Sequence, residues 1–333
     1  MKQRQCGPFK VSAIGLGCMN LNHAYGIPPS FEQAQAVLLR ALDLGVTLFD
    51  TAALYGFGTN ETLLGRVLPA HRQRITLTSK CGIFQQDGKR TIDGRPATIK
   101  KTCEDSLKRL NTDVIDLYYL HRWDKKVPIE ESVGALADLV REGKIRGIGL
   151  SEVSATTLRR AHAVHPIMAL QTEYSLWTRN PEIAVLDTCK ELGTTFVAFS
   201  PLGRGFLSAT LRDVAELAEK DIRRGMPRFE AANFSANVPL LDAYVQLAEE
   251  AGCTPAQCAL AWLLAKGDHI VPIPGTTSIS HLEEDMAAAD VVLAPALVAK
   301  LDALINQKSV TAPRYNASTQ SEIDTEEWGQ VLT

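Results

Sequence analysis

Four residues that could together move a proton stand at or just beyond the ends of short apolar runs in this chain of 333 residues. Asp50, Lys80 and His121 each end such a run, and Tyr55 follows Asp50 in the next loop. A free tyrosine has a pKa of about 10, which makes it a poor acid or base at neutral pH. A lysine cation beside the phenol lowers that pKa, and a carboxylate beside the lysine keeps the amine charged. With an imidazole to orient a carbonyl oxygen, the phenol could protonate that oxygen while its carbon accepts a hydride.

Each of these residues also has an ordinary structural role open to it. Asp50 could cap a turn, Tyr55 could pack on a neighbour, and Lys80 could be a solvated strand end. His121 shares the strand parity of the apolar residues before it, which is more typical of a core histidine. The coincidence of all four at strand ends is what favours catalysis. Because no side chain donates hydride, that interpretation also requires a cofactor.

Polar groups near the ends of later apolar runs could hold such a cofactor. Ser151 and Gln171 could hydrogen-bond a carboxamide. Phe199 is the first residue of the run Phe-Ser-Pro-Leu-Gly-Arg-Gly, and its aromatic ring could stack on a nicotinamide. The turn formed by the following residues could direct backbone N–H groups toward a pyrophosphate. The run 272–277 then leads into a helix, and a phosphate at a helix N-terminus is a frequent arrangement in parallel barrels.

The elements that must position these residues alternate along the chain. Eight apolar, often β-branched runs lie between amphipathic helical stretches, and they cover residues 13–18, 47–50, 75–80, 114–121, 145–150, 169–173, 195–199 and 270–274. Helix-capping residues such as Ser30 and Thr254 precede the helical stretches, and Gly45 and Gly143 end two of them. Eight parallel strands close a barrel whose catalytic residues lie at the carboxyl ends of the strands.

An open, doubly wound sheet is the alternative fold for this alternation. Such a sheet usually carries G-x-G-x-x-G after its first strand. Here residues 15–20 read Gly-Leu-Gly-Cys-Met-Asn, without the third glycine. We therefore predict a (β/α)8 TIM barrel formed by one domain, residues 1–306. A polar C-terminal tail, residues 307–333, follows and could cover the substrate pocket, and the arginine-rich segment 201–238 after the seventh strand is either a binding loop or a solvated insertion.

Composition and charge exclude several other classes of protein. The formal net charge of −3 predicts neither nucleic-acid nor anionic-membrane binding. The longest apolar run, residues 258–265, is far shorter than the roughly 20 residues of a membrane span, and no apolar segment follows the charged start. Seven scattered cysteines without metal-binding spacing predict reduced thiols in a cytoplasmic protein and no metal, although Cys81 beside Lys80 could be reactive.

The ordered set of motifs resembles the aldo-keto reductase superfamily, in its bacterial and plant branch that includes aryl-alcohol dehydrogenases. The motifs are Phe-Asp-Thr-Ala-Ala-Leu-Tyr-Gly at 49–56, Thr-Ser-Lys at 78–80, Asp-Leu-Tyr-Tyr-Leu-His at 116–121, Gln-Thr-Glu-Tyr-Ser-Leu at 171–176, Ser-Pro-Leu-Gly-Arg-Gly at 200–205 and Ile-Pro-Gly-Thr at 273–276. The resemblance implies a barrel enzyme that reduces aldehydes or ketones to alcohols. It assigns Tyr55 as the proton donor, Asp50 and Lys80 as its tuners, and His121 as the orienting group.

The same resemblance implies a set of cofactor contacts: Ser151, Gln171, Phe199, Ser200, Leu202, Arg204, Gly275, Thr276, Ser278, His281 and Asp285. NADP(H) is the expected cofactor, because most of the family uses it. NAD(H) is the alternative, because Thr277, Ser278 and His281 stand where relatives often carry Lys or Arg for the 2′-phosphate. Glu152 is a second departure, since relatives commonly have Asn there.

The substrate is predicted to be a small-molecule carbonyl compound or alcohol, and aromatic side chains in the pocket would suit a bulky or aromatic one. By analogy with the family's loops, Tyr25, Trp123 and the tail around 314–315 would line its pocket, although Trp123 could simply pack the rim. The second functional hypothesis is an NADP-binding redox sensor similar to the β-subunits of potassium channels, in which the cofactor reports to a partner protein. The sequence predicts no oligomeric state.

Overall fold

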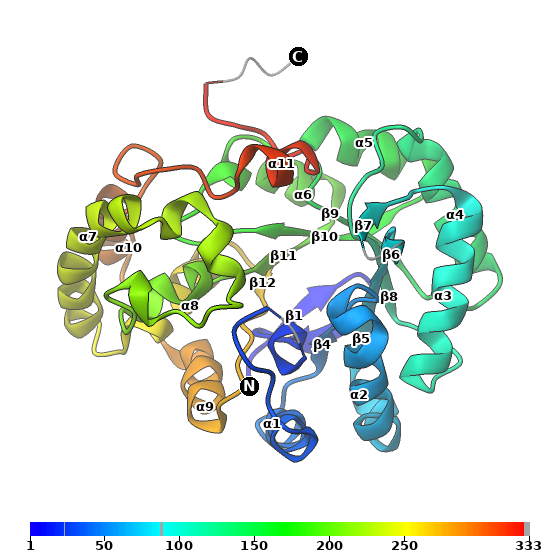
Figure 1. The fold of residues 1–333 in the computed structure, drawn as a ribbon, viewed down its shortest axis with the longest axis horizontal. Helices are drawn as coiled ribbons and strands as arrows, with labels where there is room; N and C mark the ends of the chain where they lie inside the picture. Colours follow the sequence, from blue (N-terminus) through cyan, green and yellow to red (C-terminus); the bar gives the residue numbers. More distant parts are fainter. Residues whose placement is uncertain (23, 87–88, 330–333) are drawn as a thin grey trace.

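The computed structural model describes residues 1–22, 24–86 and 89–329. Its centre is a sheet of parallel strands that neighbour one another in the order of the sequence (Figure 1). The eight strands are β3 (Leu16–Gly17), β4 (Leu48–Asp50), β5 (Thr76–Cys81), β8 (Leu117–Leu120), β9 (Ile148–Ser151), β10 (Ile167–Glu173), β11 (Thr195–Phe199) and β12 (Ile270–Pro272). Every predicted strand is present.

The two outermost strands of this order also meet, which closes the sheet. The N–H of Gly15 donates to the carbonyl of Pro272 over 3.0 Å, and the N–H of Gly17 donates to that of Pro274 over 2.9 Å. Donors and acceptors both advance by two residues, as they do between parallel strands. The contact is tight, because a Cβ on Gly17 would lie 2.9 Å from the carbonyl oxygen of Ile273. The prediction of a (β/α)8 barrel is confirmed, and the open sheet is wrong, since the strand order never reverses.

Eight helices follow the strands and surround the barrel (Figure 1): α1 (Phe31–Asp43), α2 (Thr59–Val67), α3 (Pro96–Leu110), α4 (Ile129–Arg141), α5 (Ala155–Val164), α6 (Val185–Leu192), α8 (Pro255–Ala265) and α9 (Ile279–Ala287). Local sequence explains where they begin. The Ser30 hydroxyl accepts from the N–H of Gln33, and the Gln33 side chain accepts from the N–H of Ser30, which completes a capping box at α1. The predicted apolar stripe of α1 is buried against the strands.

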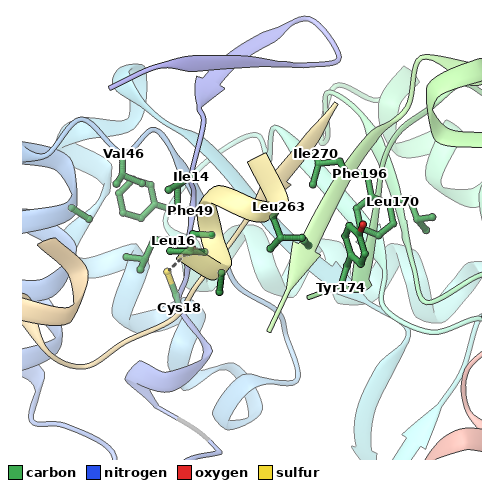
Figure 2. Packing of buried hydrophobic residues seen from close by; sticks show 14 of the residues in the cluster. Ile14, Leu16, Cys18, Val46, Phe49, Leu170, Tyr174, Phe196, Leu263 and Ile270 are labelled. Carbon is green, nitrogen blue, oxygen red and sulfur yellow. Dashed lines mark hydrogen bonds between the residues drawn. The ribbon is translucent and has the colours of Figure 1, made fainter. Parts of the chain in front are cut away.

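Alternation along the strands divides the core into two layers. In β8, Leu117 and Tyr119 point into the barrel, whereas Tyr118 and Leu120 pack under the helices. Figure 2 shows the outer layer, where Leu170 and Phe196 lie on neighbouring strands. By the same parity, the next inward position after Tyr119 is that of His121. Strand parity therefore places the histidine at the mouth of the barrel.

Three further segments complete the barrel. The hairpin of β1 (Gln3–Cys6) and β2 (Phe9–Ser12), which the sequence analysis did not predict, adds Cys6 and Val11 to the interior layer. A second hairpin, β6 (Ile83–Gln86) and β7 (Lys89–Ile92), follows β5. The long loop predicted after the seventh barrel strand is present as a series of short turns, but it ends earlier than predicted, because α7 (Ala231–Glu250) begins within it.

The chain ends in α10 (Pro295–Leu304) and a tail that includes α11 (Ala317–Ser321). This tail returns across the carboxyl ends of the strands, where the N–H of Asp324 donates to the carbonyl of Glu152 over 3.0 Å. Figure 1 shows it running past the ends of α5 and α6. In the part of the chain that the structure describes, no helix is both long and apolar enough to span a membrane.

Candidate active site

A buried ion pair joins two neighbouring strands at the barrel mouth. Asp50 ends β4, Lys80 lies in β5, and the Lys80 Nζ donates to Asp50 Oδ2 over 2.5 Å. The same nitrogen lies 2.8 Å from the carbonyl oxygen of Thr51 and 3.3 Å from the hydroxyl oxygen of Tyr55. The ammonium thus has three oxygen partners for its three protons. It is held at a fixed point beside the phenol.

A strained turn holds Tyr55 over this ion pair. The short helix Tyr55–Gly58 contains left-handed residues, with a φ of +54° at Gly56. A Cβ on Gly56 would lie 2.1 Å from the Thr59 hydroxyl oxygen, so the turn requires glycine. The turn leads directly into α2 and leaves the Tyr55 side chain only 9% exposed.

Asp50 is fixed on its other side as well. Its Oδ1 accepts from the Thr78 hydroxyl and from the Gln171 amide nitrogen, each over 2.8 Å. Gln171 comes from β10, on a distant part of the barrel wall. The carboxylate is therefore oriented by groups from two other strands, β5 and β10, and cannot rotate away from Lys80 without breaking several hydrogen bonds.

His121 follows β8 and stands beside the phenol. The backbone N–H of His121 donates to the carbonyl of Cys81 over 2.9 Å. The imidazole ring lies edge-on to the Tyr55 ring, with 5.9 Å between the ring centroids. Burial, together with the cations Arg122 and Lys80, holds the pKa of His121 well below its ordinary value. The ring is therefore neutral at physiological pH. Its Nδ1 is buried without a hydrogen-bond partner among the described residues, which leaves Nε2 for the cavity.

The protonation of Tyr55 differs from the expectation. Burial raises the pKa of Tyr55 above its ordinary value, and the nearby Lys80 cation only partly opposes this. For Lys80, burial alone would lower the pKa, but the charges of Asp50 and Tyr55 and the hydrogen bonds to both together outweigh it, and the pKa is raised. The expected net lowering of the tyrosine pKa is therefore wrong, because the cost of a buried phenolate exceeds the attraction of an ammonium already paired with a carboxylate. The pair at neutral pH is a phenol and an ammonium, which suits a proton donor.

These side chains lie at one end of a cavity of about 580 Å³. The cavity extends along the rim from β4 to the start of α9. It brings together most of the residues predicted for catalysis and cofactor binding, namely Asp50, Tyr55, His121, Ser151, Gln171, Phe199, Ser200, Leu202, Arg204, Gly275, Thr276, His281 and Asp285. Lys80 lies beneath the lining, under Tyr55.

Ser151 and Gln171 have complementary groups free beside the catalytic centre. The Ser151 hydroxyl accepts from Arg122 Nη1 over 3.2 Å, so its own proton remains available as a donor. The Gln171 amide nitrogen is used by Asp50, so its carbonyl oxygen remains available as an acceptor. One donor and one acceptor side by side are what a carboxamide requires.

Arg204 does not offer a free charge to a phosphate. Its Nη2 donates to Glu173 over 2.8 Å and to the hydroxyl of Tyr315 over 3.0 Å, and the side chain is only 8% exposed. Its neighbours Ser200 and Leu202 line the cavity directly, and Phe199 does so at the end of β11. The turn that follows β11 therefore contributes mainly an aromatic surface and backbone to the cavity.

The far end of the cavity is formed by the loop before α9. Ser278 is not among the lining residues, because its hydroxyl caps α9 by accepting from the N–H of His281. Gly275 lines the cavity and also packs closely against β3. A Cβ on Gly275 would lie 2.7 Å from the carbonyl oxygen of Gly17. Burial, reinforced by Glu284, raises the pKa of Asp285 to about 8.

The two predicted pocket aromatics have different positions. Tyr25 lines the cavity, where the Arg223 guanidinium lies 5.1 Å from its ring centroid. Trp123 does not line it. The Trp123 indole N–H donates to the carbonyl of Val127 over 2.8 Å, which turns the ring toward the helical layer and away from the cavity. Arg223 belongs to the long loop, so part of that loop contributes to the site.

The tail reaches the same rim through a network of buried charges. Arg314 forms an ion pair with Glu152, and its Nη1 lies 3.6 Å from Glu173 Oε2. Its neighbour Tyr315 lines the cavity. Burial would raise the pKa of Glu173, but the charges of Arg204 and Arg314 outweigh it and hold the pKa at about 2. The departure noted at Glu152 is thus an anchor for the tail.

Two further arginines that the sequence analysis did not single out line the cavity, Arg90 and Arg122. Arg90 comes from the β6–β7 hairpin and forms an ion pair with Glu322 of the tail. Arg122 could have been predicted from the sequence, because it is a charged residue that directly follows His121 at a strand end. No feature of the sequence around Arg90 predicts that it lines the cavity, because its position depends on the β6–β7 hairpin.

Neither metal nor reactive-thiol chemistry is supported within residues 1–22, 24–86 and 89–329. No cluster of three or more His, Cys, Asp or Glu side chains there could hold a metal ion. Cys81 is fully buried, and burial raises the pKa of its thiol. The alternative of a reactive thiolate beside Lys80 therefore finds no basis in the structure.

Comparison with known proteins gives a consistent result. The aldo/keto reductase family matches residues 13–306. An aldo-keto reductase of Schizosaccharomyces pombe, whose name specifies NADP(+), is 43% identical over 327 residues, with 96% of each chain covered.

Solved structures show the same likeness. A glycerol dehydrogenase of Gluconobacter oxydans has a TM-score of 0.85 at 27% identity, over 93% of this chain and 97% of that one. An aldo/keto reductase of Klebsiella pneumoniae, solved in complex with NADP and acetate, has a TM-score of 0.73 at 27% identity, over 97% of this chain and 99% of that one.

Proposed function

The chain belongs to the aldo/keto reductase family, and from this premise we propose that it reduces aldehydes or ketones to alcohols with NADPH, Tyr55 serving as the acid. The observation that carries the proposal is the contact of one ammonium, Lys80 Nζ, with both Asp50 and Tyr55 at the end of a cavity. The contact positions the phenol next to a cation, and burial keeps the phenol protonated there.

The residues present fit a nicotinamide cofactor. The free proton of Ser151 and the free oxygen of Gln171 match the two ends of a carboxamide, and Phe199 offers a ring on the same rim. The cavity continues to the N-terminus of α9, whose partial positive charge favours a phosphate. When bound there, the cofactor supplies the hydride.

The side chains of the protein handle the substrate oxygen. Tyr55 donates its proton to that oxygen as negative charge develops on it, and the adjacent Lys80 cation stabilises the resulting phenolate. His121 is neutral, and its Nε2 donates a hydrogen bond that orients the same oxygen. Asp50 keeps Lys80 charged and in place. The low exposure of all four side chains strengthens these electrostatic effects.

NADP(H) is proposed in preference to NAD(H) because the name of the Schizosaccharomyces pombe relative specifies NADP(+) and the Klebsiella pneumoniae structure is a complex with NADP. No Lys or Arg lines the described cavity at the α9 end, where Thr277 and His281 are the polar side chains available to a 2′-phosphate. The tail, through Tyr315, is proposed to cover the substrate end of the cavity. A cytoplasmic location is also proposed, supported by seven free cysteines.

Oxidation of NADPH and of NADH by the purified protein tests this function, with a panel of aromatic, aliphatic and sugar aldehydes and ketones. Turnover with NADPH is the expected result. A preference for NADH would show that the polar loop before α9 selects the other cofactor. Tight cofactor binding with negligible turnover would instead support the redox-sensor hypothesis, for which the described site, with its four catalytic side chains in contact, offers no specific observation.

A further inference from the structure

One of the arginines that line the cavity has no acidic partner. Among the described residues, Arg90, Arg204 and Arg223 each pair with a carboxylate, Glu322, Glu173 and Asp221 respectively. Arg122 also lines the cavity, yet no carboxylate of the described chain lies within ion-pair distance of it. Its exposed fraction is 7%. A guanidinium cannot shed its proton, so this buried charge remains uncompensated in the protein alone.

The hydrogen bonds of Arg122 leave part of its guanidinium unused. Nη1 donates to the carbonyl of His121 over 2.7 Å and to the Ser151 hydroxyl over 3.2 Å. Nε is buried and has no partner among the described residues, and no hydrogen bond from Nη2 is formed within them. Nε and Nη2 together form one edge of the planar fork, and this edge matches the two oxygens of a carboxylate. The bonds of Nη1 hold the side chain in place while that edge remains unpaired.

The position of Arg122 indicates which molecule carries the missing anion. It directly follows His121, the proposed ligand of the substrate oxygen, and it contacts Ser151 at the carboxamide end. Under the proposed function, the cofactor phosphates bind at the opposite end, by the turn after β11 and the start of α9. Arg122 instead contacts the residues proposed to bind the substrate oxygen and the carboxamide. This position favours the substrate as the source of the anion.

We propose that this reductase is selective for oxo acids, carbonyl compounds whose carboxylate lies close to the carbonyl group, and that Arg122 binds this carboxylate. Nε is buried in the protein alone, so a two-point contact requires the guanidinium to turn until Nε also faces the ligand. The proposal rests on the proposed function and deepens it. It adds a specificity-determining residue to a site whose other side chains act on the carbonyl oxygen.

A different role for Arg122 makes different predictions. Because Nη1 donates to Ser151, the arginine could serve only to orient that hydroxyl toward the cofactor. Its loss would then weaken NADPH binding and slow charged and neutral substrates alike. An anion-binding arginine, by contrast, affects the charged substrate much more than the neutral one. The ratio of the two rates separates the roles.

The test compares each acid with its methyl ester, which keeps the skeleton of the acid, adds one methyl group and carries no charge. The pairs are phenylglyoxylate with methyl phenylglyoxylate, and 4-carboxybenzaldehyde with methyl 4-formylbenzoate. For each pair the ratio of kcat/KM, acid over ester, is measured in the wild type, Arg122→Gln, Arg122→Lys and the control Arg95→Gln. Arg95 loses the same charge outside the cavity, where its side chain is 71% exposed.

We expect Arg122→Gln to lower the ratio for phenylglyoxylate about 10- to 100-fold, because a hydrogen-bonded charge pair is lost. Arg122→Lys should restore part of the ratio, and Arg95→Gln should leave it unchanged. The second pair should respond less, since its carboxylate lies farther from the carbonyl. As a readout independent of turnover, binding of mandelate to the NADP-loaded protein, measured by calorimetry, should weaken by a similar factor in Arg122→Gln.

An unchanged ratio in Arg122→Gln would overturn the proposal while leaving the reductase function intact, provided the esters are still reduced. An equal loss for acid and ester, together with weaker NADPH binding, would also overturn it and assign Arg122 to positioning Ser151. If the wild type reduces neither member of either pair nor any compound of the wider panel, the proposed function itself fails. Should Arg122→Gln not fold, Arg122→Lys supplies the comparison.

Discussion

Two buried charge networks lie a short distance apart on the rim, and they differ in construction. The catalytic network joins Asp50 and Lys80, on adjacent strands, to Tyr55 in the turn after β4, and the three are at most 30 positions apart. The tail network joins Glu152 to Arg314 across 162 positions of sequence, between a strand end and the tail. Both contain a carboxylate paired with a cation, away from water.

What each network holds in place also differs. In the catalytic network the ion pair fixes a neutral phenol, the proposed proton donor. In the tail network the ion pairs carry no reactive group, and they tie a separate segment to the barrel. The same interaction therefore positions a reactive group in one network and anchors a segment of the chain in the other. Substitutions in the catalytic network should therefore act mainly on kcat, and substitutions in the tail network should act mainly on KM and on stability.

The largest effect is expected from Tyr55→Phe. This change removes the proton donor and leaves the ring, so kcat/KM for carbonyl reduction should fall about 10³-fold. The affinity for NADPH, followed by quenching of protein fluorescence, and the melting temperature should stay near those of the wild type. Rates like those of the wild type in this variant would remove Tyr55 from the mechanism.

His121→Ala should have the next largest effect. Loss of one preorganised donor to the substrate oxygen should lower kcat about 100-fold, with a much smaller change in NADPH affinity. The pH dependence should also be informative. The lowered pKa of His121 keeps the ring neutral, so its titration should not reduce the wild-type rate between pH 6 and 8. Parallel losses of turnover and cofactor binding would indicate a structural histidine instead.

In the tail network, Glu152→Gln should act on stability and on KM. Removing one partner of a buried ion pair should lower the free energy of unfolding by about 3 kcal/mol. Hydrogen exchange should quicken in the segment 314–326, and KM should rise while kcat changes little. The matched control is Glu130→Gln, which breaks the exposed pair with Arg160 and should cost much less, because water and salt screen an exposed pair. Equal costs in the two variants would mean that the tail network is no stronger than a surface pair.

The smallest effect is expected at Asp285, where the cofactor would bind. Its pKa of about 8 keeps the carboxyl protonated at pH 7, and the group ionises as the pH rises above 8. The new negative charge should repel the phosphates of NADPH, so the dissociation constant of NADPH should rise about threefold between pH 7 and 9. Asp285→Asn should abolish this rise. A slope that survives in Asp285→Asn would place the titrating group elsewhere.

Much of the catalytic end follows from local sequence. Hydrophobic periodicity and helix caps are short-range signals, and eight strands of one direction have few ways to close. Asp50, Lys80 and His121 were predictable because residues at the carboxyl ends of barrel strands must meet at one rim. Tyr55 was predictable from its place in the loop after Asp50. For the same reason Ser151, Gln171 and Phe199 lie along one cavity.

The remaining features depended on tertiary structure, because their partners are remote in sequence or their energies depend on burial. The position of the tail depends on the ion pair between Glu152 and Arg314. Trp123 lies outside the cavity lining, with its indole N–H bonded to the carbonyl of Val127. The pKa of Tyr55 is raised although a lowered pKa was expected, because the degree of burial cannot be known from the identities of the neighbouring residues. By itself, the sequence of this protein determined the barrel and the types of groups on its rim. Which of those groups are already paired, and which remain available to a ligand, was decided only by packing, because pairing and desolvation depend on distances in space.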